Sequence, residues 1–218
     1  GYVTEAERQP PEKGGPGSAV FANSGWAYVG GASWRRPYGP GSGIEGLEDH
    51  PVVHVTYADA SAYAQWAGRV LPTEEQYEYA ARLGRDSAFA AGAQGRARYR
   101  ANTWQGVFPF RNSGEDGFLG TAPAACFEAD ELGLHDILGN VWEWTSTPYY
   151  PRHQPPADLV ARFPDGLNPT DASTGARVIK GGSFLCADSY CMRYRPSARR
   201  PQQVDTGMSH IGFRCVKR

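Results

Sequence analysis

The stretch HPVVHVTYADASAYAQWAGRVLPTEEQYEYAARLG, residues 50–84, carries the clearest structural signals in the sequence. Its opening, HPVVHVTY, places alternating apolar residues after a proline and predicts a strand in which His54 lies beside the core. The remainder has the spacing of two short helices separated by a turn. We therefore expect the organised part of the fold to begin near residue 50.

Two helices are predicted, over residues 57–67 and 74–83. Each has a threonine at the N-cap position, a polar residue three positions later that resembles a capping box, and a glycine that can end the helix. These residues are Thr56, Asp59 and Gly68 in the first helix and Thr73, Gln76 and Gly84 in the second. The apolar stripe of the first helix comprises Ala60, Tyr63, Ala64 and Ala67.

Short strand-like pieces, separated by loops that contain Gly, Asn and Pro, follow residue 84. They are NTWQGVF, GLHDILGNVWEWT, ARVIKGGSF and HIGFRCV. Residues 151–176 are rich in Pro and Asp and predict an ordered surface loop. Residues 1–48 are rich in Gly and Pro and predict an irregular, partly exposed arm. One domain, residues 1–218, is expected from the length.

The composition is that of a loop-rich globular protein. With 218 residues, of which 40% are hydrophobic, the chain can bury a proper core. Its 27 Gly, 17 Pro, 12 Tyr and 6 Trp favour a fold in which aromatic rings fill irregular space. No apolar run approaches the roughly 20 residues of a membrane helix, so no membrane partner is expected.

The net charge of −1 predicts no nucleic-acid partner. Residues 176–218 carry nine Lys or Arg against two Asp or Glu. We interpret this basic end as the complement of the acidic remainder within one fold.

Several familiar chemistries are disfavoured by the motifs. Four cysteines are too few for a disulfide scaffold in a chain of this size, and no C-x-x-C zinc spacing occurs. His50 and His54 lie four residues apart, but Pro51 and the missing Glu rule out the helix of zinc proteases. No phosphate-binding loop, nucleophile elbow or dinucleotide fingerprint is present.

Cys186 and Cys191 lie five residues apart in KGGSFLCADSYCMRYRP, residues 180–196. By itself the pair is open to four interpretations: a disulfide, a metal site, a reactive thiol pair or two buried sulfur atoms. The preceding GGS allows a close approach of the backbone to another group. Thiolate pairs are soft ligands that select an ion such as Cu(I). Four arginines could favour the thiolate form: Arg193, Arg195, Arg199 and Arg200.

Six motifs, in order along residues 31–217, resemble those of the formylglycine-generating enzymes, the sulfatase-modifying factor family. They are LPTEEQYEYAAR, ANTWQG, NSGEDGF, LGNVWEWT, GGSFLCADSYCMRYRPSARR and HIGFRC. The resemblance implies an α+β fold related to C-type lectins, with low regular content and two main helices packed on small antiparallel sheets. The family's N-terminal strands, which precede its Gly-Tyr-x-Thr-x-Ala-Glu stretch, are absent from this sequence.

The resemblance also implies a reaction. The cysteine of a Cys-x-Pro-x-Arg motif in an unfolded sulfatase is oxidised to formylglycine by O2, with a thiol reductant. Cys186 and Cys191 match the pair that holds Cu(I), which the substrate thiol joins as a further ligand. Ser183 and Trp142 match residues that line that pocket. A Cu(I) ion held by two thiolates is coordinatively unsaturated, so a third sulfur can bind.

The resemblance further implies one or two structural Ca²⁺ ions. The residues that match one site are Asn102, Asp116 and the carbonyls of Thr103 and Phe118; those that match a second are Asp136, Glu143 and the carbonyls of Gly139 and Val141. Both segments place hard oxygen donors near glycines that permit tight turns, as Ca²⁺ requires. Without the resemblance, the same residues would be interpreted as Asx turns.

Departures from the family pattern qualify these expectations. His210 stands where characterised members have Asn, close to the peptide groove, so that substrate preference is open. Ala64 and Ala81 stand where the vertebrate enzyme has cysteines, which leaves Cys215 without a mate. This favours a bacterial, cytoplasmic protein over a secreted or endoplasmic-reticulum one, and we expect a monomer. The alternatives are a binding module that has lost the reaction and an oxidase of a small thiol or amine. Retention of both cysteines favours an oxidase over a binding module.

Overall fold

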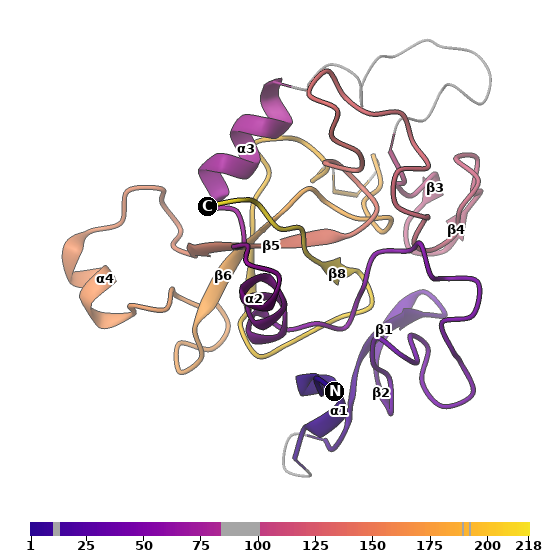
Figure 1. Cartoon of the computed structure of the whole chain (residues 1–218), viewed down its shortest axis with the longest axis horizontal. Coiled ribbons are helices and arrows are strands. Elements are labelled where there is room, and N and C mark those ends of the chain that lie inside the picture. Colours follow the sequence, from indigo (N-terminus) through magenta and orange to yellow (C-terminus); the bar gives the residue numbers. More distant parts are fainter. Residues whose placement is uncertain (11–13, 84–100, 189, 192) are drawn as a thin grey trace.

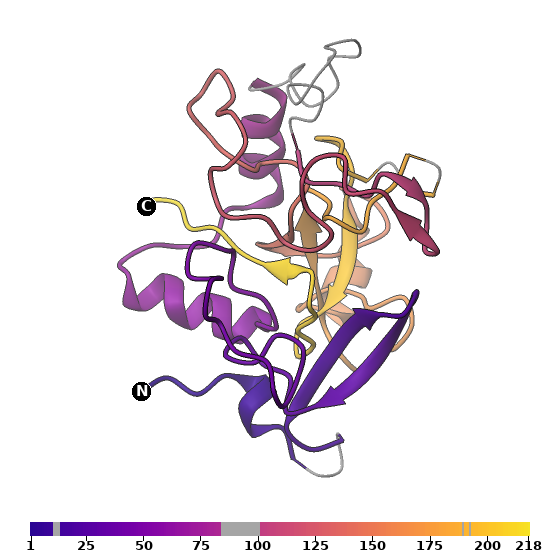
Figure 2. The same cartoon turned by 90° about the vertical axis from the view of Figure 1, so that its right-hand side faces the viewer.

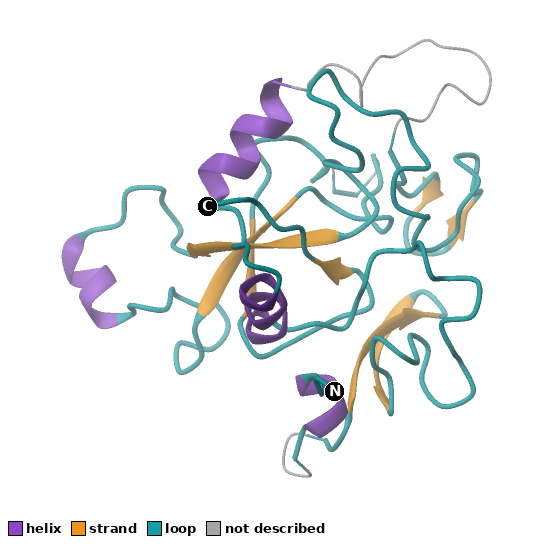
Figure 3. Ribbon diagram, in the orientation of Figure 1, coloured by secondary structure: helices purple, strands orange, loops and turns teal. Residues whose placement is uncertain are grey.

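A computed structural model describes residues 1–10, 14–83, 101–188, 190–191 and 193–218. Most of the chain lies in loops, and short helices and strands are distributed among them (Figure 3). This agrees with the predicted α+β fold of low regular content. The helices are α1 (Glu5–Arg8), α2 (Tyr57–Trp66), α3 (Glu74–Leu83) and α4 (Ala157–Arg162). The strands are β1 (Gly17–Ala22), β2 (Gly25–Gly30), β3 (Gly106–Val107), β4 (Arg111–Asn112), β5 (Trp142–Pro148), β6 (Ala176–Lys180), β7 (Arg200–Gln203) and β8 (Ile211–Gly212).

A four-stranded sheet in the order β7-β6-β5-β8 forms the centre of the fold (Figure 1). The β5–β6 and β6–β7 pairs are antiparallel, whereas β8 runs parallel to β5. The sheet is therefore mixed, and the prediction of a purely antiparallel sheet is wrong at this edge. Strands β7 and β8 lie at opposite edges of the sheet. Residues 204–210 carry the chain from one edge to the other, and β8 then runs parallel to β5.

Helices α2 and α3 lie on one side of this sheet, and the β1–β2 and β3–β4 hairpins lie on the other (Figure 2). Both predicted helices are confirmed to within a residue. Thr56 Oγ1 accepts a hydrogen bond from Asp59 N at 3.2 Å, and the Asp59 carboxylate accepts one from Thr56 N at 2.9 Å. Thr73 and Gln76 form the equivalent reciprocal pair at the start of α3. Gly84 lies outside the described residues.

The core contact of α2 is narrower than predicted. Ala60 and Ala64 are buried and pack with the core residues Trp144 and Ile211. Tyr63 is 52% exposed and Ala67 is also exposed, so the predicted four-residue stripe is wrong for these two positions. Tyr57, at the start of α2, also packs against the core, with its ring 6.0 Å from that of Trp144, and the Trp144 indole donates to Val55 O at 3.0 Å.

The predicted strand over residues 50–57 does not form. His54 adopts a φ of 61°, in the left-handed region, which interrupts an extended conformation. The segment instead makes single main-chain bonds to a neighbouring loop, from His54 N to Met208 O and from Tyr57 N to Val204 O. His54 is nevertheless fully buried, and its Nε2 lies 2.9 Å from Pro37 O. The prediction of a core histidine is therefore right, although the strand is wrong.

Two other predicted strands are shorter in the structure than expected. In GLHDILGNVWEWT the strand begins only at Trp142, because Asp136, Gly139 and Asn140 have positive φ and form turns. In NTWQGVF only Gly106 and Val107 belong to a strand. Residues 151–176 contain helix α4 in addition to the predicted surface loop.

The N-terminal region is more ordered than the arm predicted from its composition. Strands β1 and β2 form an antiparallel hairpin whose turn residues Asn23 and Ser24 both have positive φ. Two hydrogen bonds connect the hairpin to the loop before β8: Ser18 Oγ donates to Gly207 O at 2.8 Å, and Phe21 N donates to Ser209 Oγ at 3.1 Å. No helix among the described residues has the length and apolar character needed to cross a membrane.

Candidate active site: a cysteine pair in an aromatic cleft

A cleft of about 250 Å³ opens between the two hairpins and the central sheet. The hairpins contribute Phe21, Trp26, Phe108 and Pro109, and strands β5 and β7 contribute Trp142 and Arg200. The loop between β6 and β7 supplies most of the remaining wall: Ser183, Leu185, Cys186, Tyr190, Cys191 and Arg193. The structure therefore brings together the four residues predicted to be catalytic, Cys186, Cys191, Ser183 and Trp142.

The cysteines lie on consecutive tight turns that follow β6. Cys186 N donates to Ser183 O at 2.8 Å, and Cys191 N donates to Ala187 O at 2.9 Å. Gly182 starts this path with a φ of 78°, and a Cβ there would lie 2.9 Å from the main chain of Tyr194. The close approach allowed by the glycine is thus to the protein's own backbone, which folds the cysteine loop back on itself.

The two thiols face each other. All four cysteines of the chain are free, so the disulfide interpretation of Cys186 and Cys191 does not describe this structure. The Cys186 thiol donates a hydrogen bond to Cys191, and this bond lowers the pKa of Cys191 to about 6, an effect that Arg193 reinforces. The same hydrogen bond and burial raise the pKa of Cys186. The pair is therefore suited to hold one proton between its two sulfur atoms near neutral pH.

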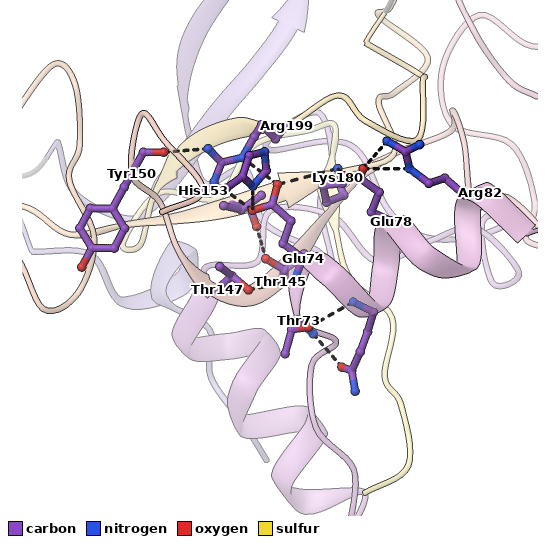
Figure 4. Close-up of polar contacts among 12 residues, drawn as sticks. Thr73, Glu74, Glu78, Arg82, Thr145, Thr147, Tyr150, His153, Lys180 and Arg199 are labelled. Atoms are coloured by element: carbon purple, nitrogen blue, oxygen red, sulfur yellow. Dashed lines mark hydrogen bonds and ion pairs between the residues drawn. The ribbon is translucent and has the colours of Figure 1, made fainter. Parts of the chain in front are cut away.

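Of the four arginines that follow, two line the cleft, Arg193 and Arg200. Arg199, which immediately precedes β7, instead reaches α3, where its guanidinium donates to both carboxylate oxygens of Glu74 at 2.7 and 2.9 Å (Figure 4). It also donates to Tyr150 O at 2.7 Å. Arg199 is therefore a structural residue, and the positive charge near the thiols comes from Arg193 and Arg200.

Ser183 and Trp142 are almost fully buried behind the thiols. Ser183 Oγ accepts a hydrogen bond from Leu185 N at 3.3 Å and so holds the turn that carries Cys186. Trp142 N donates to His210 O at 2.8 Å. These contacts give both residues a part in shaping the cleft floor.

His210 lies in the same wall, as expected from its proximity to the peptide groove. Its ring packs against Trp26 with centroids 4.7 Å apart, and its Nδ1 is buried without a hydrogen-bond partner among the described residues. Burial, followed by the charge of Arg200, lowers the pKa of His210 to about 3. The imidazole is therefore neutral at physiological pH.

The aromatic part of the cleft was missed by the sequence analysis. Phe108 stacks on Tyr190 with centroids 4.7 Å apart, and Phe21 stacks on Phe108 at 5.6 Å. Trp26 meets the edge of Phe21 at 5.4 Å. The sequence did contain a signal for the first hairpin. In GSAVFANSGWAYVG, residues 17–30, two strand-like runs flank an Asn-Ser turn, which is typical of a β-hairpin.

The residues of the first predicted calcium set flank the β3–β4 hairpin, Asn102 and Thr103 before it and Asp116 and Phe118 after it. The Asp116 carboxylate accepts hydrogen bonds from Thr103 N at 3.1 Å and Phe118 N at 3.0 Å. Gln105 Nε2, which was not predicted, donates to the same carboxylate at 2.7 Å. Asn102 is 1% exposed, and its Oδ1 is buried without a hydrogen-bond partner among the described residues. A buried amide oxygen without a donor suits a hard cation.

The second predicted set contains a positive charge of the protein itself. Arg214 donates to both carboxylate oxygens of Glu143, at 2.5 and 2.7 Å, and to the carbonyl of Asp136 at 3.0 Å. Asp136 Oδ1 is buried with no partner in the described part of the chain, and burial raises the pKa of this carboxyl group. The turn between them carries Gly139 and Val141. The unpartnered oxygen suits a cation, but Arg214 already balances the charge of Glu143.

Neither set is a cluster of charged ligands. Within the described ranges, no three His, Cys, Asp or Glu side chains converge in an arrangement that could hold a metal ion. Any ion bound at the predicted sites would therefore depend on amide and carbonyl oxygens, or on the thiol pair, for its remaining ligands.

Comparison with known sequences gives the family. The sequence model described as "Sulfatase-modifying factor enzyme 1-like domain" matches residues 2–218. The formylglycine-generating enzyme of Mycobacterium tuberculosis is 47% identical over 240 residues, which covers 99% of this chain and 80% of that protein. The chain belongs to the formylglycine-generating enzyme family. The enzyme of that name from Thermomonospora curvata is 44% identical, covering 99% of this chain and 75% of the relative.

Two solved structures share the fold of this chain. PvdO from Pseudomonas aeruginosa superposes with a TM-score of 0.53 at 22% identity, covering 76% of this chain and 60% of that chain. CarF gives a TM-score of 0.51 at 20% identity, covering 87% of this chain and 74% of that chain. At these identities the likeness establishes the fold alone.

The family also includes relatives with other names. A mouse "Inactive C-alpha-formylglycine-generating enzyme 2" is 39% identical, covering 88% of this chain and 56% of the relative. A hercynine oxygenase from Mycolicibacterium thermoresistibile is 32% identical, covering 82% of this chain and 40% of the relative. The function of this chain therefore has to be argued from its own cleft.

Proposed function

We propose that this protein oxidises the cysteine of a Cys-x-Pro-x-Arg motif in a sulfatase polypeptide to formylglycine. The observation that carries the proposal is the facing pair Cys186 and Cys191, free and hydrogen-bonded, at the wall of an accessible cleft. A chain that had kept only the fold would not need a polarised thiol pair beside a cleft. Its similarity to enzymes named for this activity supports the same conclusion.

The reaction needs an external reductant. Conversion of a thiol group R–CH2–SH to the aldehyde R–CHO with release of hydrogen sulfide removes two electrons, whereas reduction of O2 to water takes up four. Two molecules of a thiol reductant supply the other two electrons and leave as a disulfide. Balanced, one R–CH2–SH, one O2 and two reductant thiols give one R–CHO, one hydrogen sulfide, one water and one disulfide.

We propose that Cys186 and Cys191 hold Cu(I), which supplies the one-electron chemistry with O2 that side chains lack. The lowered pKa of Cys191 and the softness of sulfur suit this ion. No third cysteine occurs among the described residues that line the cleft. A ligand position on the ion would therefore remain for the sulfur of the substrate. Without metal, the two thiols share one proton. Because a thiol must be deprotonated to bind a metal, this proton would be released on binding.

The other cleft residues position the substrate. The rings of Trp26, Phe108 and Tyr190 form apolar walls that can hold an extended peptide and keep water away from the sulfur atoms. Trp142 closes the floor and is 1% exposed. In this proposal the substrate cysteine binds next to Cys191, the more accessible of the two thiols.

We further propose that Ca²⁺ has a structural role. Asn102 and Asp116, with the carbonyls of Thr103 and Phe118, would hold one ion, and the buried Asn102 Oδ1 is the oxygen that most needs such a partner. A second ion would need Asp136 Oδ1, beside the Arg214–Glu143 pair. Arg214 already binds the Glu143 carboxylate and the Asp136 carbonyl there.

The test is conversion of a synthetic Cys-x-Pro-x-Arg peptide, followed by mass spectrometry. With copper, O2 and a thiol reductant present, we expect the peptide to lose the mass that separates cysteine from formylglycine. The same peptide with serine in place of cysteine should remain unchanged. If neither the peptide nor an unfolded sulfatase is converted but a small thiol is consumed, the protein is an oxidase of small molecules. If nothing is consumed, it is a binding module.

A further inference from the structure

Arg199, which immediately precedes β7, and Arg200, its first residue, are consecutive but have different environments. Arg199 faces α3, where Glu74 binds its guanidinium through two hydrogen bonds (Figure 4). Arg200 lines the cleft with Cys186 and Cys191. The chain therefore presents one arginine that is satisfied within the protein and one that faces the candidate active site.

Arg200 is partly buried and has no carboxylate partner among the described residues. Among the described residues no carboxylate forms an ion pair with its guanidinium, and no hydrogen bond from its side chain is seen. No Asp or Glu occurs among the described residues that line the cleft, whereas a second guanidinium, that of Arg193, does. The ionisable groups that interact electrostatically with Arg200 are Arg193, the two thiols, Tyr190 and His210.

Two guanidinium groups face the cleft, and no carboxylate occurs among the described residues that line it. Withdrawing a charged group from water is unfavourable unless an opposite charge or hydrogen-bond acceptors replace the lost hydration. The planar guanidinium group matches the two oxygens of a carboxylate and binds them in a fork, so a carboxylate is its best partner. The neutral ring of His210 lies in the same wall and adds no competing positive charge at physiological pH.

We propose that Arg200, assisted by Arg193, forms a carboxylate-binding subsite beside the cysteine pair. The carboxylate belongs either to an acidic residue next to the cysteine of the client polypeptide or to the thiol that serves as reductant. In both cases Arg200 determines specificity and does not take part in bond breaking. The proposal rests on the proposed function, because it uses the same cleft and the same client.

The first arm of the test varies the client. Peptides containing Cys-x-Pro-x-Arg carry Glu or Gln in turn at the position before the cysteine and at each x position. We expect at least one Glu peptide to have a KM roughly tenfold below that of its Gln partner, as a charge-assisted hydrogen bond provides. Arg200→Gln should bring this ratio to about one, whereas Arg200→Lys should retain part of it, because Lys keeps the charge but loses the fork.

The second arm varies the reductant with a Gln peptide held fixed. 3-Mercaptopropionate carries a carboxylate, and 2-mercaptoethanol is its uncharged counterpart. If the carboxylate comes from the reductant, the preference for 3-mercaptopropionate appears in this arm and disappears in Arg200→Gln. Arg162→Gln is the matched control, since Arg162 lies on α4, at the opposite end of the molecule from the β3–β4 hairpin (Figure 1). Circular dichroism and the melting temperature establish that each variant is folded.

Binding without turnover separates this proposal from the proposed function. Glu and Gln peptides with serine in place of the client cysteine are titrated by isothermal calorimetry. An Arg200-dependent preference for Glu in calorimetry, with no conversion of any peptide, would keep the carboxylate subsite and reject the oxidase. Absence of any carboxylate preference in all three measurements would overturn the subsite. An equal loss of activity towards charged and uncharged partners in Arg200→Gln would also overturn it, because Arg200 would then only offset the charge of the thiolates.

Discussion

Glu74 lies at the centre of a buried ion network that joins α3 to β6 and β7 (Figure 4). Its side chain is 3% exposed and accepts two hydrogen bonds from Arg199, and Lys180 Nζ, fully buried, lies 3.9 Å away. Lys180 in turn pairs with Glu78 at 2.9 Å. Replacing Glu74 by Gln removes the only carboxylate that Arg199 contacts among the described residues, whereas Lys180 keeps its pair with Glu78.

The expected loss follows from that geometry. Removing one member of a buried pair costs about 3–5 kcal/mol of the free energy of unfolding, because the remaining charge is uncompensated. In a chain of this length that corresponds to a fall in melting temperature of roughly 10 °C. Lys180→Met is the matched variant: it removes the buried ammonium group, while Glu74 keeps Arg199 and Glu78 keeps Arg82. We expect Lys180→Met to change stability by about 1 kcal/mol or less.

The assay is equilibrium unfolding in urea, followed by tryptophan fluorescence, with the slope of the transition compared among variants. If Glu74→Gln lowered the free energy of unfolding by less than about 1 kcal/mol, the reasoning would be refuted. Leaving one partner of a buried ion pair uncompensated costs about 3–5 kcal/mol. An equal loss in Glu74→Gln and Lys180→Met would refute it too, because packing would then outweigh charge. A large loss in Glu74→Gln alone supports it.

Three further predictions concern metals and protons. Excess chelator should lower the melting temperature, and Asp116→Ala should remove part of that effect; an unchanged melting temperature after proven loss of the ion would contradict the calcium assignment. In metal-free, reduced protein, iodoacetamide should modify Cys191 before Cys186, at a rate that rises with pH through about 6, measured by peptide mass spectrometry. Equal labelling of both thiols would speak against the hydrogen-bonded pair. The buried rings of His54 and His210 have pKa values lowered to about 4 and about 3, so the stability they contribute is complete above their unfolded pKa and is lost as pH falls below it. Urea unfolding should show a loss of about 2 kcal/mol per histidine between pH 7 and 5, and a flat profile would exclude this.

The parts of the fold that could be predicted from sequence are those set by local chemistry. The helices α2 and α3 begin at reciprocal side-chain to backbone bonds, Thr56 with Asp59 and Thr73 with Gln76, and those depend only on residues three apart. The strand predicted around His54 failed because its conformation is imposed by contacts with residues 204–208, which are distant in sequence. No local pattern reports such contacts.

The site divides in the same way. The cysteine pair could be located from its motif, because both residues lie in one short loop. The aromatic wall could not, since Phe21 and Phe108 come from separate hairpins, distant in sequence, that meet only in the folded chain. Likewise, Arg214 reaches Glu143 across 71 positions and changes the charge of a predicted calcium site. Composition alone cannot show that a neutralising guanidinium is already present.

The roles of the four arginines after the cysteines illustrate the limit. The sequence shows only that positive charge is near the thiols. In the folded chain, hydrogen bonds assign Arg199 to Glu74, whereas Arg200 lines the cleft. The same two-residue run therefore contains a stability residue and a candidate specificity residue.

The most direct test of the central claim is the Cu(I) stoichiometry of single cysteine variants, measured anaerobically under reducing conditions against a chromogenic Cu(I) chelator. Unmutated protein and Cys126→Ser, a control at an exposed free cysteine, should each bind one Cu(I) and convert the Cys-x-Pro-x-Arg peptide. Cys186→Ser and Cys191→Ser should bind substantially less copper and convert none, while remaining folded. Full copper binding and full turnover in Cys191→Ser would contradict the paired-thiolate site.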